Sequence, residues 1–370
     1  MSELRVALIG SRGIPANYGG YETLMEELAP RLQDRGLEVT VYCRSHYTPR
    51  RLTEYRGVRL VVLPTLATKH LDTPVHTLLS TLHAARQRFD VALVVNSANA
   101  AFLPILRSRG IATALHVDGI ERQRAKWGVF GTSVYSLSER LATSLPHVVV
   151  SDAEVVREYF QRRWGIESRV ISYGVDPRPE PPGDMLAKLG LESRKYFLYV
   201  SRFEPENNPH TVAEAYRNVG GDLALVMVGT APYARKFIRS FTRDADPRIL
   251  FPGAIYGRGY RELLSNAFAY IHATEVGGTH PALVEAMGYG NCVVVNQTPE
   301  NVEAAGGKGL PFRAENPASL ARALNKLRSE PNLATELGSD ALQYALKTYN
   351  WDHVADQYLQ LFRDLAGSDR

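Results

Sequence analysis

Short runs of β-branched and aliphatic residues alternate with longer amphipathic stretches along most of the chain. In the first half, strands are expected at 6–9, 39–43, 58–63, 91–95, 112–116 and 148–150, with helices such as 21–35 and 78–88 between them. The second half repeats this order, with strands expected at 197–200, 224–228, 249–251, 270–272 and 293–295 and helices around 211–218, 233–242, 258–267 and 281–288. Because parallel strands need crossover connections, this order predicts an α/β chain built on parallel sheets.

The length of 370 residues exceeds what one hydrophobic core usually holds, so two domains are expected. The stretch 174–183 is rich in Pro and Gly, which indicates a connection and not a helix or strand. We therefore expect a Rossmann-like domain at 1–174, a linker at 175–184, a second Rossmann-like domain at 185–350 and a helix at 351–370. Ligands of such sheets bind at the carboxyl ends of the strands, so the expected site is a cleft between two facing domains.

A glycine turn followed by an apolar helix is the most specific functional signal of the second half. Gly277 and Gly278 lack Cβ atoms, and the first N–H groups of a helix starting near Thr279 suit an anion or a sugar. Glu285 follows about one and a half turns later, where a carboxylate can accept hydrogen bonds from two neighbouring ribose hydroxyls. The alternative is a structural helix with a glycine cap and a solvated glutamate.

This segment resembles the donor-binding segment of the family-four retaining glycosyltransferases, through Glu285-Ala286-Met287 after a glycine turn and a proline. It departs from their usual form because nine residues, where the family has seven, separate Glu275 from Glu285. A second segment, 10–23, is similar to the N-terminal signature of a rhamnosyltransferase-like subgroup. Its sequence is Gly-Ser-Arg-Gly-Ile-Pro-Ala-Asn-Tyr-Gly-Gly-Tyr-Glu-Thr.

The resemblance implies the GT-B fold, in which two Rossmann-like doubly wound domains face each other and a last helix crosses back to the first domain. It also implies transfer with retention of configuration, no metal, and no cofactor apart from the nucleotide-diphosphate sugar that serves as substrate. In the resembling enzymes, Gly19 and Gly20 approach the phosphates and sugar of this donor. The segment around Gly253 and Tyr256 resembles the loop that holds the base.

Arg202 follows a predicted strand, where a guanidinium can hold a pyrophosphate with two hydrogen bonds and act in catalysis. A surface ion pair with Glu204 is the alternative. Family-four enzymes usually carry a lysine five residues after this arginine, and this chain has Asn207 there. The charge that stabilises the departing nucleotide then comes from Arg202, helix amides, and either Lys236 or Arg235.

His116 and Asp118 follow the fifth predicted strand and are the other catalytic candidates. Either could contact the transferred sugar or steer the acceptor hydroxyl, and Asp118 is favoured because it lies nearer the loop. A structural role for His116 is the alternative. The loop at 10–20 lacks the Gly-x-Gly-x-x-Gly pattern, and the second strand ends in Cys43-Arg44 with no acid for a ribose, which argues against a nicotinamide dehydrogenase.

The net charge of +4 is unevenly distributed, because residues 1–180 hold 23 Lys and Arg against 18 Asp and Glu while the remainder holds 20 against 21. This surplus suits an anionic acceptor or a phospholipid surface, and scattered solvated charge explains it equally well. Its clusters lie at 50–51, 107–109, 122–127 and 162–164. No basic stripe with interleaved aromatics accompanies them, so nucleic acid is not an expected partner.

Two cysteines without metal-type spacing, no signal-like start and no long apolar stretch predict a cytoplasmic protein, free or peripheral at the inner membrane face. The predicted function is hexosyl transfer, with rhamnose as first choice and dTDP-rhamnose as its donor, to a glycan or lipid-linked acceptor in polysaccharide or glycoconjugate synthesis. The alternatives are a non-hydrolysing sugar-nucleotide epimerase, a non-catalytic sugar-nucleotide-binding protein and a phosphorylase.

Overall fold

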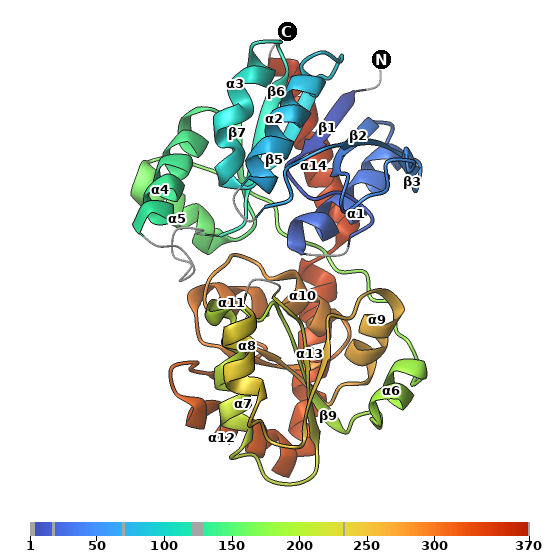
Figure 1. Cartoon of the computed structure of the whole chain (residues 1–370), viewed down its shortest axis with the longest axis vertical. Helices are drawn as coiled ribbons and strands as arrows, with labels where there is room; N and C mark the ends of the chain where they lie inside the picture. Colours follow the sequence, from blue (N-terminus) through green and yellow to red (C-terminus); the bar gives the residue numbers. More distant parts are fainter. Residues whose placement is uncertain (1–3, 17–18, 69–70, 120–128, 232–233, 369–370) are drawn as a thin grey trace. The chain divides into compact units, whose positions relative to one another are not determined.

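The computed structural model describes residues 4–16, 19–68, 71–119, 129–231 and 234–368, with the backbone alone for 129–135 and 368. These residues form two compact units. One contains the described residues up to Gly174 and those from Trp351 onward, and the other contains Val175–Asn350. Each unit has a central sheet between helices (Figure 1).

The sheet of the first unit has the strand order β3-β4-β2-β1-β5-β6-β7-β8. Neighbouring strands are parallel except for the antiparallel pair β3 and β4. The six expected strands are confirmed, whereas β3 and β8 have two residues each and are too short to show a sequence pattern. The strands are β1 (Arg5–Ile9), β2 (Glu38–Arg44), β3 (Glu54–Tyr55), β4 (Val58–Leu63), β5 (Val91–Val95), β6 (Ala112–Val117), β7 (Val148–Ser151) and β8 (Arg169–Val170).

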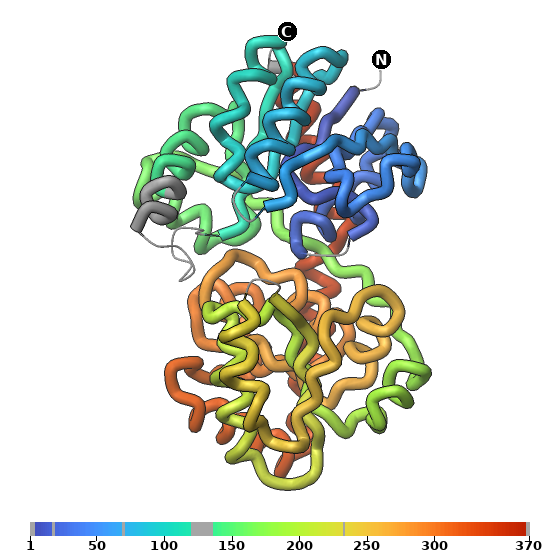
Figure 2. Tube along the Cα trace, viewed as in Figure 1, coloured from blue at the N-terminus to red at the C-terminus, as the bar shows by residue number. Residues whose placement is uncertain are grey.

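Helices cover both faces of this sheet. One apolar cluster joins β1, β2 and β5 to α1 and α14, and a second joins the opposite face to α2, α3 and α5. Figure 2 shows the red C-terminal helix beside the blue N-terminal segments, and Arg35 after α1 pairs with Asp352 and Asp356 of α14. The helices are α1 (Gly20–Asp34), α2 (Asp72–Ala84), α3 (Leu103–Arg107), α4 (Val129–Ser144), α5 (Glu154–Trp164) and α14 (Trp351–Ser368), with a 3-10 turn, η1 (Ser97–Phe102).

The predicted helix at 78–88 is wrong in its bounds, because α2 begins at Asp72 and ends at Ala84. Its buried face consists largely of polar residues, including His76, Thr77 and Thr81, which hides the usual apolar periodicity. The Thr77 hydroxyl bonds Asn99, and the Thr81 hydroxyl bonds the Thr77 carbonyl, so these two buried hydroxyls have partners.

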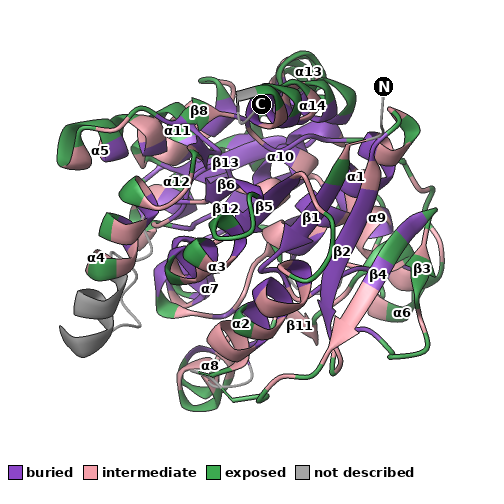
Figure 3. Ribbon diagram, turned by 90° about the horizontal axis from the view of Figure 1, so that it is seen from above, coloured by how far each residue is buried: buried purple, intermediate pink, exposed green. Residues whose placement is uncertain are grey.

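The second unit has a six-stranded parallel sheet of order β11-β10-β9-β12-β13-β14. Its five expected strands are confirmed, and β14, which contains a proline, was not expected. The strands are β9 (Tyr196–Val200), β10 (Ala224–Val228), β11 (Ile249–Gly253), β12 (Ala269–His272), β13 (Cys292–Asn296) and β14 (Leu310–Phe312). Figure 3 illustrates the burial that parallel strands require, with β1, β2 and β5 of the first unit largely purple.

Helices also cover both faces of the second sheet. Residues of α7, α8 and α12 pack in one apolar cluster, and residues of α6, α9, α10, α11 and α13 pack in the other. The helices are α6 (Asp184–Leu189), α7 (Pro209–Tyr216), α8 (Arg235–Thr242), α9 (Gly257–Asn266), α10 (Pro281–Gly288), α11 (Pro299–Ala305), α12 (Pro317–Ser329) and α13 (Pro331–Thr348), with a 3-10 turn, η3 (Pro205–Asn207).

Candidate functional site

Arg202 stands just after β9, at the carboxyl end of a central strand of the second sheet. Its Nη1 lies 3.6 Å from Oε2 of Glu204, and its side chain keeps 34% of its surface exposed. The ion pair between Arg202 and Glu204, given above as the alternative, is therefore present. Exposed pairs of this kind contribute only about 0–1 kcal/mol, so the guanidinium can exchange Glu204 for a more highly charged phosphate.

Asn207 occupies the position where a lysine was expected. Its Nδ2 donates to the carbonyl of Arg202 at 2.7 Å, and its own carbonyl accepts from the Tyr199 hydroxyl at 2.7 Å. The residue is buried at 4% exposure. Asn207 thus supplies no positive charge, but it fastens the backbone that carries Arg202.

Glu275 is tied to the turn that follows Arg202. Its Oε1 accepts a hydrogen bond from Nδ2 of Asn208 at 2.9 Å, and its backbone N–H donates to the carbonyl of Glu206 at 2.9 Å. Asn208 also bonds the carbonyl of Ala273. Since β9 and β12 are neighbours in the sheet, these bonds join the two loops that leave their carboxyl ends.

The glycine turn lies deeper than the sequence indicates. Gly277, Gly278 and Thr279 are all buried, and a Cβ on Gly277 would collide with the imidazole of His280. The His280 ring in turn lies 4.7 Å, centroid to centroid, from that of His272. A larger residue at 277 would therefore require the His280 ring to shift, whatever a ligand demands.

The helix expected at 281–288 is confirmed, because α10 begins at Pro281 with His280 as its N-cap, two residues after the start near Thr279 that the glycine turn suggested. Proline suits this first position, since its ring fixes the helical φ and its missing N–H costs nothing there. The N–H groups of Leu283 and Val284 both point back to the His280 carbonyl. Thr279 consequently belongs to the turn, and its N–H is not one of the free amides of a helix.

Glu285 is the single ionisable residue of α10 and is partly buried. Its Oε2 accepts a hydrogen bond of 2.6 Å from the hydroxyl of Tyr260 on α9. Such charge-assisted bonds hold a carboxylate in one orientation. Burial and the neighbouring Glu285 charge raise the pKa of Tyr260 well above its usual value, so this phenol remains a donor.

The segment expected to contact a base leads directly into α9. Gly253 ends β11 with a φ of +84°, a left-handed conformation that glycine adopts without strain, and its carbonyl accepts from Gly229 N–H at 3.0 Å. Tyr256 is the N-cap of α9 and has 53% of its surface exposed. A large exposed aromatic face at a strand end suits stacking on a planar ring.

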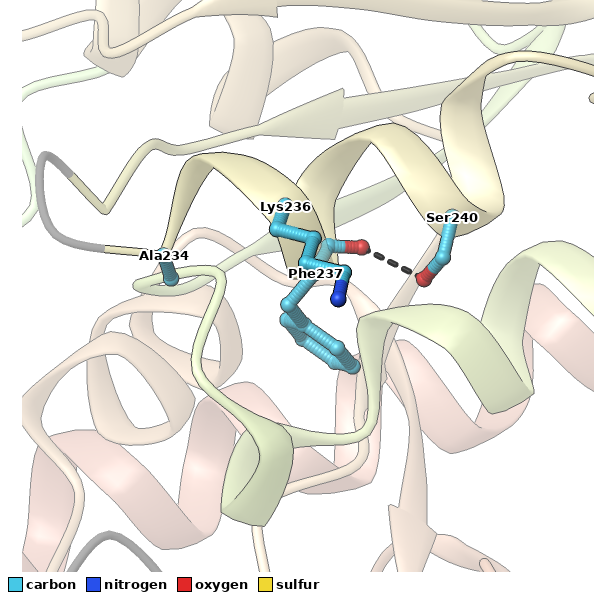
Figure 4. Close-up of a pocket in the computed structure, with 4 residues that line it drawn as sticks. All are labelled: Ala234, Lys236, Phe237 and Ser240. Carbon is cyan, nitrogen blue, oxygen red and sulfur yellow. Dashed lines mark hydrogen bonds between the residues drawn. The ribbon is translucent and has the colours of Figure 1, made fainter.

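Lys236 and Arg235 lie in the first turn of α8, and both are exposed. Lys236 lines a surface hollow of about 460 Å³ together with Ala234, Phe237 and Ser240 (Figure 4). The Ser240 hydroxyl donates to the Phe237 carbonyl at 2.6 Å, and the Phe237 ring packs on His210. The hollow therefore offers a cation beside an aromatic wall.

In the first unit, Asp118 follows β6 and is held by α1. The hydroxyl of Tyr21 donates to Oδ1 of Asp118 at 2.6 Å, and the Tyr21 ring meets His116 edge-on at 5.8 Å. His116 is fully buried, with Nδ1 3.2 Å from the hydroxyl of Tyr358. Burial lowers the pKa of His116 to about 3, so its ring is neutral. Any ligand contact of His116 has to use Nε2, which has no hydrogen-bond partner among the described residues.

The loop before α1 donates a backbone hydrogen bond to a buried carboxylate. Oε1 of Glu22 accepts from the backbone N–H of Arg12 at 2.7 Å. Burial raises the pKa of Glu22, and the Arg12 hydrogen bond and charge oppose that shift. Gly19 is the exposed N-cap of α1, and Gly20 is its first residue. The end of this loop therefore presents backbone where the helix begins.

Three residues that matter to this geometry were missed from the sequence, namely Tyr21, Asn208 and Tyr260. Tyr260 could have been found, because it precedes Leu263 and Leu264 by three and four positions and so shares their buried helical face. A buried tyrosine hydroxyl usually has a hydrogen-bond partner. Tyr21 and Asn208 form tertiary bonds that no local pattern reveals.

Within the described ranges, no group of three His, Cys, Asp or Glu side chains lies close enough to bind a metal ion. None of the described helices combines the length and apolarity needed to cross a bilayer. The basic cluster at 122–127 lies outside the described residues. In the cluster at 162–164, Arg162 pairs with Glu158 at 3.1 Å, and Arg163 lies 4.0 Å from Glu139.

Comparison with known proteins finds a matching domain family for each half of the chain. Residues 3–176 match a domain of unknown function (DUF1972), and residues 184–344 match the glycosyl transferases group 1. The alpha-maltose-1-phosphate synthase of Mycolicibacterium smegmatis is 25% identical over 287 residues, which are 69% of this chain and 73% of that protein.

Solved structures agree over nearly the whole chain. Sucrose-phosphate synthase from Thermosynechococcus elongatus has a TM-score of 0.85 at 19% identity, covering 99% of this chain and 100% of that one. The Anabaena HepE protein in complex with UDP and glucose has a TM-score of 0.79 at 15% identity, covering 98% and 100%. These similarities establish the fold, and the expected GT-B architecture of two Rossmann-like domains is confirmed.

Proposed function

We propose that the chain is a glycosyltransferase that transfers a hexose with retention of configuration, because residues 184–344 match the glycosyl transferases group 1 and the chain has the GT-B fold. The donor is a nucleoside diphosphate sugar, with rhamnose or a similar hexose as the transferred group. The acceptor is a hydroxyl of a glycan or lipid-linked sugar. The product belongs to a polysaccharide or related glycoconjugate.

One structural relationship carries this proposal. Arg202 follows β9, while the buried turn at 277–279 and Glu285 follow β12, the neighbouring strand. The bonds from Asn208 and Glu206 to Glu275 hold the two loops together. A guanidinium, close-packed backbone and a fixed carboxylate thus follow the carboxyl ends of two neighbouring strands, and they match the pyrophosphate and the sugar hydroxyls of a nucleotide donor in chemistry.

The catalytic contribution of these residues is electrostatic. As the glycosidic bond to the nucleotide breaks, negative charge builds on the pyrophosphate, and Arg202 stabilises it. The acceptor hydroxyl attacks the face from which the nucleotide leaves, so retention needs no protein nucleophile. Asp118, fixed by Tyr21, aligns this hydroxyl or a hydroxyl of the transferred sugar.

Two similarities bear on the identity of the donor. The Anabaena HepE protein was solved with UDP-glucose and with UDP and glucose, which supports a hexose on a pyrimidine nucleotide. The resemblance of residues 10–23 to rhamnosyltransferase-like enzymes favours a thymidine-diphosphate sugar such as dTDP-rhamnose. Both nucleotides therefore belong in the first screen.

A thermal-shift screen of thymidine, uridine, guanosine and adenosine diphosphates and their sugars tests the proposal. A ligand at 100 times its Kd stabilises the protein by about 2.7 kcal/mol, and we expect thymidine compounds to give the largest shift. Slow release of nucleotide from the stabilising sugar, without acceptor, should follow. A shift without release would support a binding protein, and a preference for guanosine or adenosine would contradict the donor assignment.

A further inference from the structure

Tyr260 and Glu285 form a fixed pair between two consecutive helices of the second unit. Tyr260 lies on α9, directly after the base-contact segment that ends at Tyr256, and Glu285 lies on α10, after the turn at 277–279. Residues of both helices pack in the same apolar cluster, which includes Leu263 and Val284. The 2.6 Å bond between Oη of Tyr260 and Oε2 of Glu285 therefore joins two rigid elements.

This bond limits what Glu285 can offer to a ligand. A carboxylate that grips the neighbouring 2′- and 3′-hydroxyls of a ribose uses one oxygen for each. Oε2 already accepts a short, charge-assisted bond from Tyr260, so it is a poorer acceptor for a second hydroxyl. The pKa of Tyr260 is raised well above its usual value by burial first and by the Glu285 charge next, so the phenol does not lose this proton at working pH.

We propose that Tyr260 sets the nucleoside selectivity of the site by reserving Oε2 of Glu285, so that the enzyme accepts 2′-deoxyribonucleotide donors as readily as ribonucleotide donors. This inference rests on the proposed function, because it assigns Glu285 to the sugar of a nucleotide. Oε1 takes the 3′-hydroxyl, which ribose and deoxyribose both carry. Loss of the 2′-hydroxyl then leaves no protein group unsatisfied and costs little affinity.

The test compares nucleotides that differ only at the 2′-oxygen. Dissociation constants of the wild-type protein are measured by calorimetry for uridine and 2′-deoxyuridine diphosphates, and for 5-methyluridine and thymidine diphosphates. We expect the deoxy compound to bind less than about fivefold more weakly in each pair. A penalty above about fivefold would overturn the proposal, and this measurement requires no variant.

Tyr260→Phe tests the cause. Without the phenol, Oε2 loses the Tyr260 hydrogen bond in a partly buried place, and the 2′-hydroxyl can supply a bond in its stead. The preference for ribose over deoxyribose should therefore rise to about tenfold, chiefly through tighter binding of the ribonucleotide. An unchanged ratio in a folded Tyr260→Phe protein would overturn the proposal.

Tyr289→Phe is the matched control. Tyr289 ends α10, close enough for the Glu285 charge to affect its pKa, but its hydroxyl accepts from the backbone N–H of Arg178 at 3.2 Å. Its ribose-to-deoxyribose ratio should equal that of the wild type. If the wild-type protein binds no member of either pair, the proposed function itself fails, and the selectivity falls with it. If all four nucleotides bind with a strong preference for ribose, the proposed selectivity is wrong and the proposed function still stands.

Discussion

The hydroxyl of Tyr21 donates a 2.6 Å hydrogen bond to Oδ1 of Asp118, which joins the first turn of α1 to the end of β6. The two residues are 97 positions apart in the chain. Tyr21 also packs edge-on against His116, which the fold buries completely. His116, within β6, is buried, whereas Asp118 is held in a defined orientation at a partly exposed position just after the strand.

Asp118→Ala should lower the turnover number by about 100-fold, and Tyr21→Phe by about 10-fold, because the first removes the aligning group and the second only loosens it. Donor KM should change less than threefold in both. Tyr55→Phe is the matched control, since Tyr55 also donates at 2.6 Å to a carboxylate of α1, that of Glu26. Steady-state kinetics with saturating acceptor measures these effects. Equal turnover numbers for Tyr21→Phe and Tyr55→Phe would contradict the catalytic role proposed for Asp118.

Substitution of Glu285 and substitution of Arg202 should cause different kinetic defects. If Glu285 binds the nucleotide's sugar equally in the ground and transition states, as proposed, Glu285→Ala should weaken donor binding by about 1.5–3 kcal/mol with a smaller effect on turnover. If Arg202 stabilises charge that develops during the reaction, Arg202→Ala should lower turnover by about 100-fold with a smaller change in affinity. The donor is varied at saturating acceptor, after circular dichroism confirms folding. Wild-type turnover and affinity in both variants would place the donor elsewhere.

Lys236 should carry part of the charge that Asn207 does not supply. Lys236→Ala should raise the Kd of the nucleoside diphosphate by about 10-fold and that of the nucleoside by less than twofold, because only the former presents a pyrophosphate. Arg243→Ala, which removes an exposed cation at the other end of α8, is the control. Calorimetry on each variant measures these constants. If Arg235→Ala alone shows the selective loss, the role belongs to Arg235.

Acid should destabilise the protein through buried neutral histidines. Burial lowers the pKa of His116 and His272 to about 3 and that of His76 to about 4. The unfolded chain protonates these groups near pH 6.5, so their stabilising effect is complete above that pH and is lost as the pH falls towards the folded pKa values. The expected slope is about 1.4 kcal/mol per pH unit for each histidine.

Urea unfolding at pH 7.5, 6.0 and 5.0 measures this slope. His272→Gln should flatten it for the second unit, whereas His353→Gln, at an exposed position of α14, should leave the slope of the first unit unchanged. Parallel stability curves for wild type and His272→Gln would show that the buried ring does not govern acid sensitivity.

The basic surplus of residues 1–180 predicts binding to anionic vesicles if the acceptor is lipid-linked. Each engaged cation near such a surface contributes about 1 kcal/mol, so replacing Arg162 and Arg163 by Ala should weaken sedimentation with phosphatidylglycerol vesicles by about 10-fold or more. Added salt should weaken it further. Equal sedimentation with neutral vesicles would leave these arginines as solvated surface, consistent with their pairing to Glu158 and Glu139.

The strands were predictable because buried parallel strands are continuous apolar runs, such as Val91–Val95. Prediction failed where burial was not apolar or where pairing was short. The polar buried face of α2 hid six residues of helix, and β3, β8 and β14 have two or three residues each. The bounds 281–288 of α10 were predicted as observed, because Pro281 defines the first turn, although a threonine after two glycines also resembles a cap.

The sequence alone determined the α/β order and the two series of strands, and it predicted the residue types of a nucleotide-sugar site, because periodicity and loop chemistry are local properties. Only the tertiary structure decided which groups meet. Nothing local indicates that Tyr260 holds Glu285, 25 positions further along the chain, or that Tyr21 holds Asp118, 97 positions away. The orientation and burial of a side chain depend on segments distant in sequence, and these decide what a carboxylate or guanidinium can still offer to a ligand.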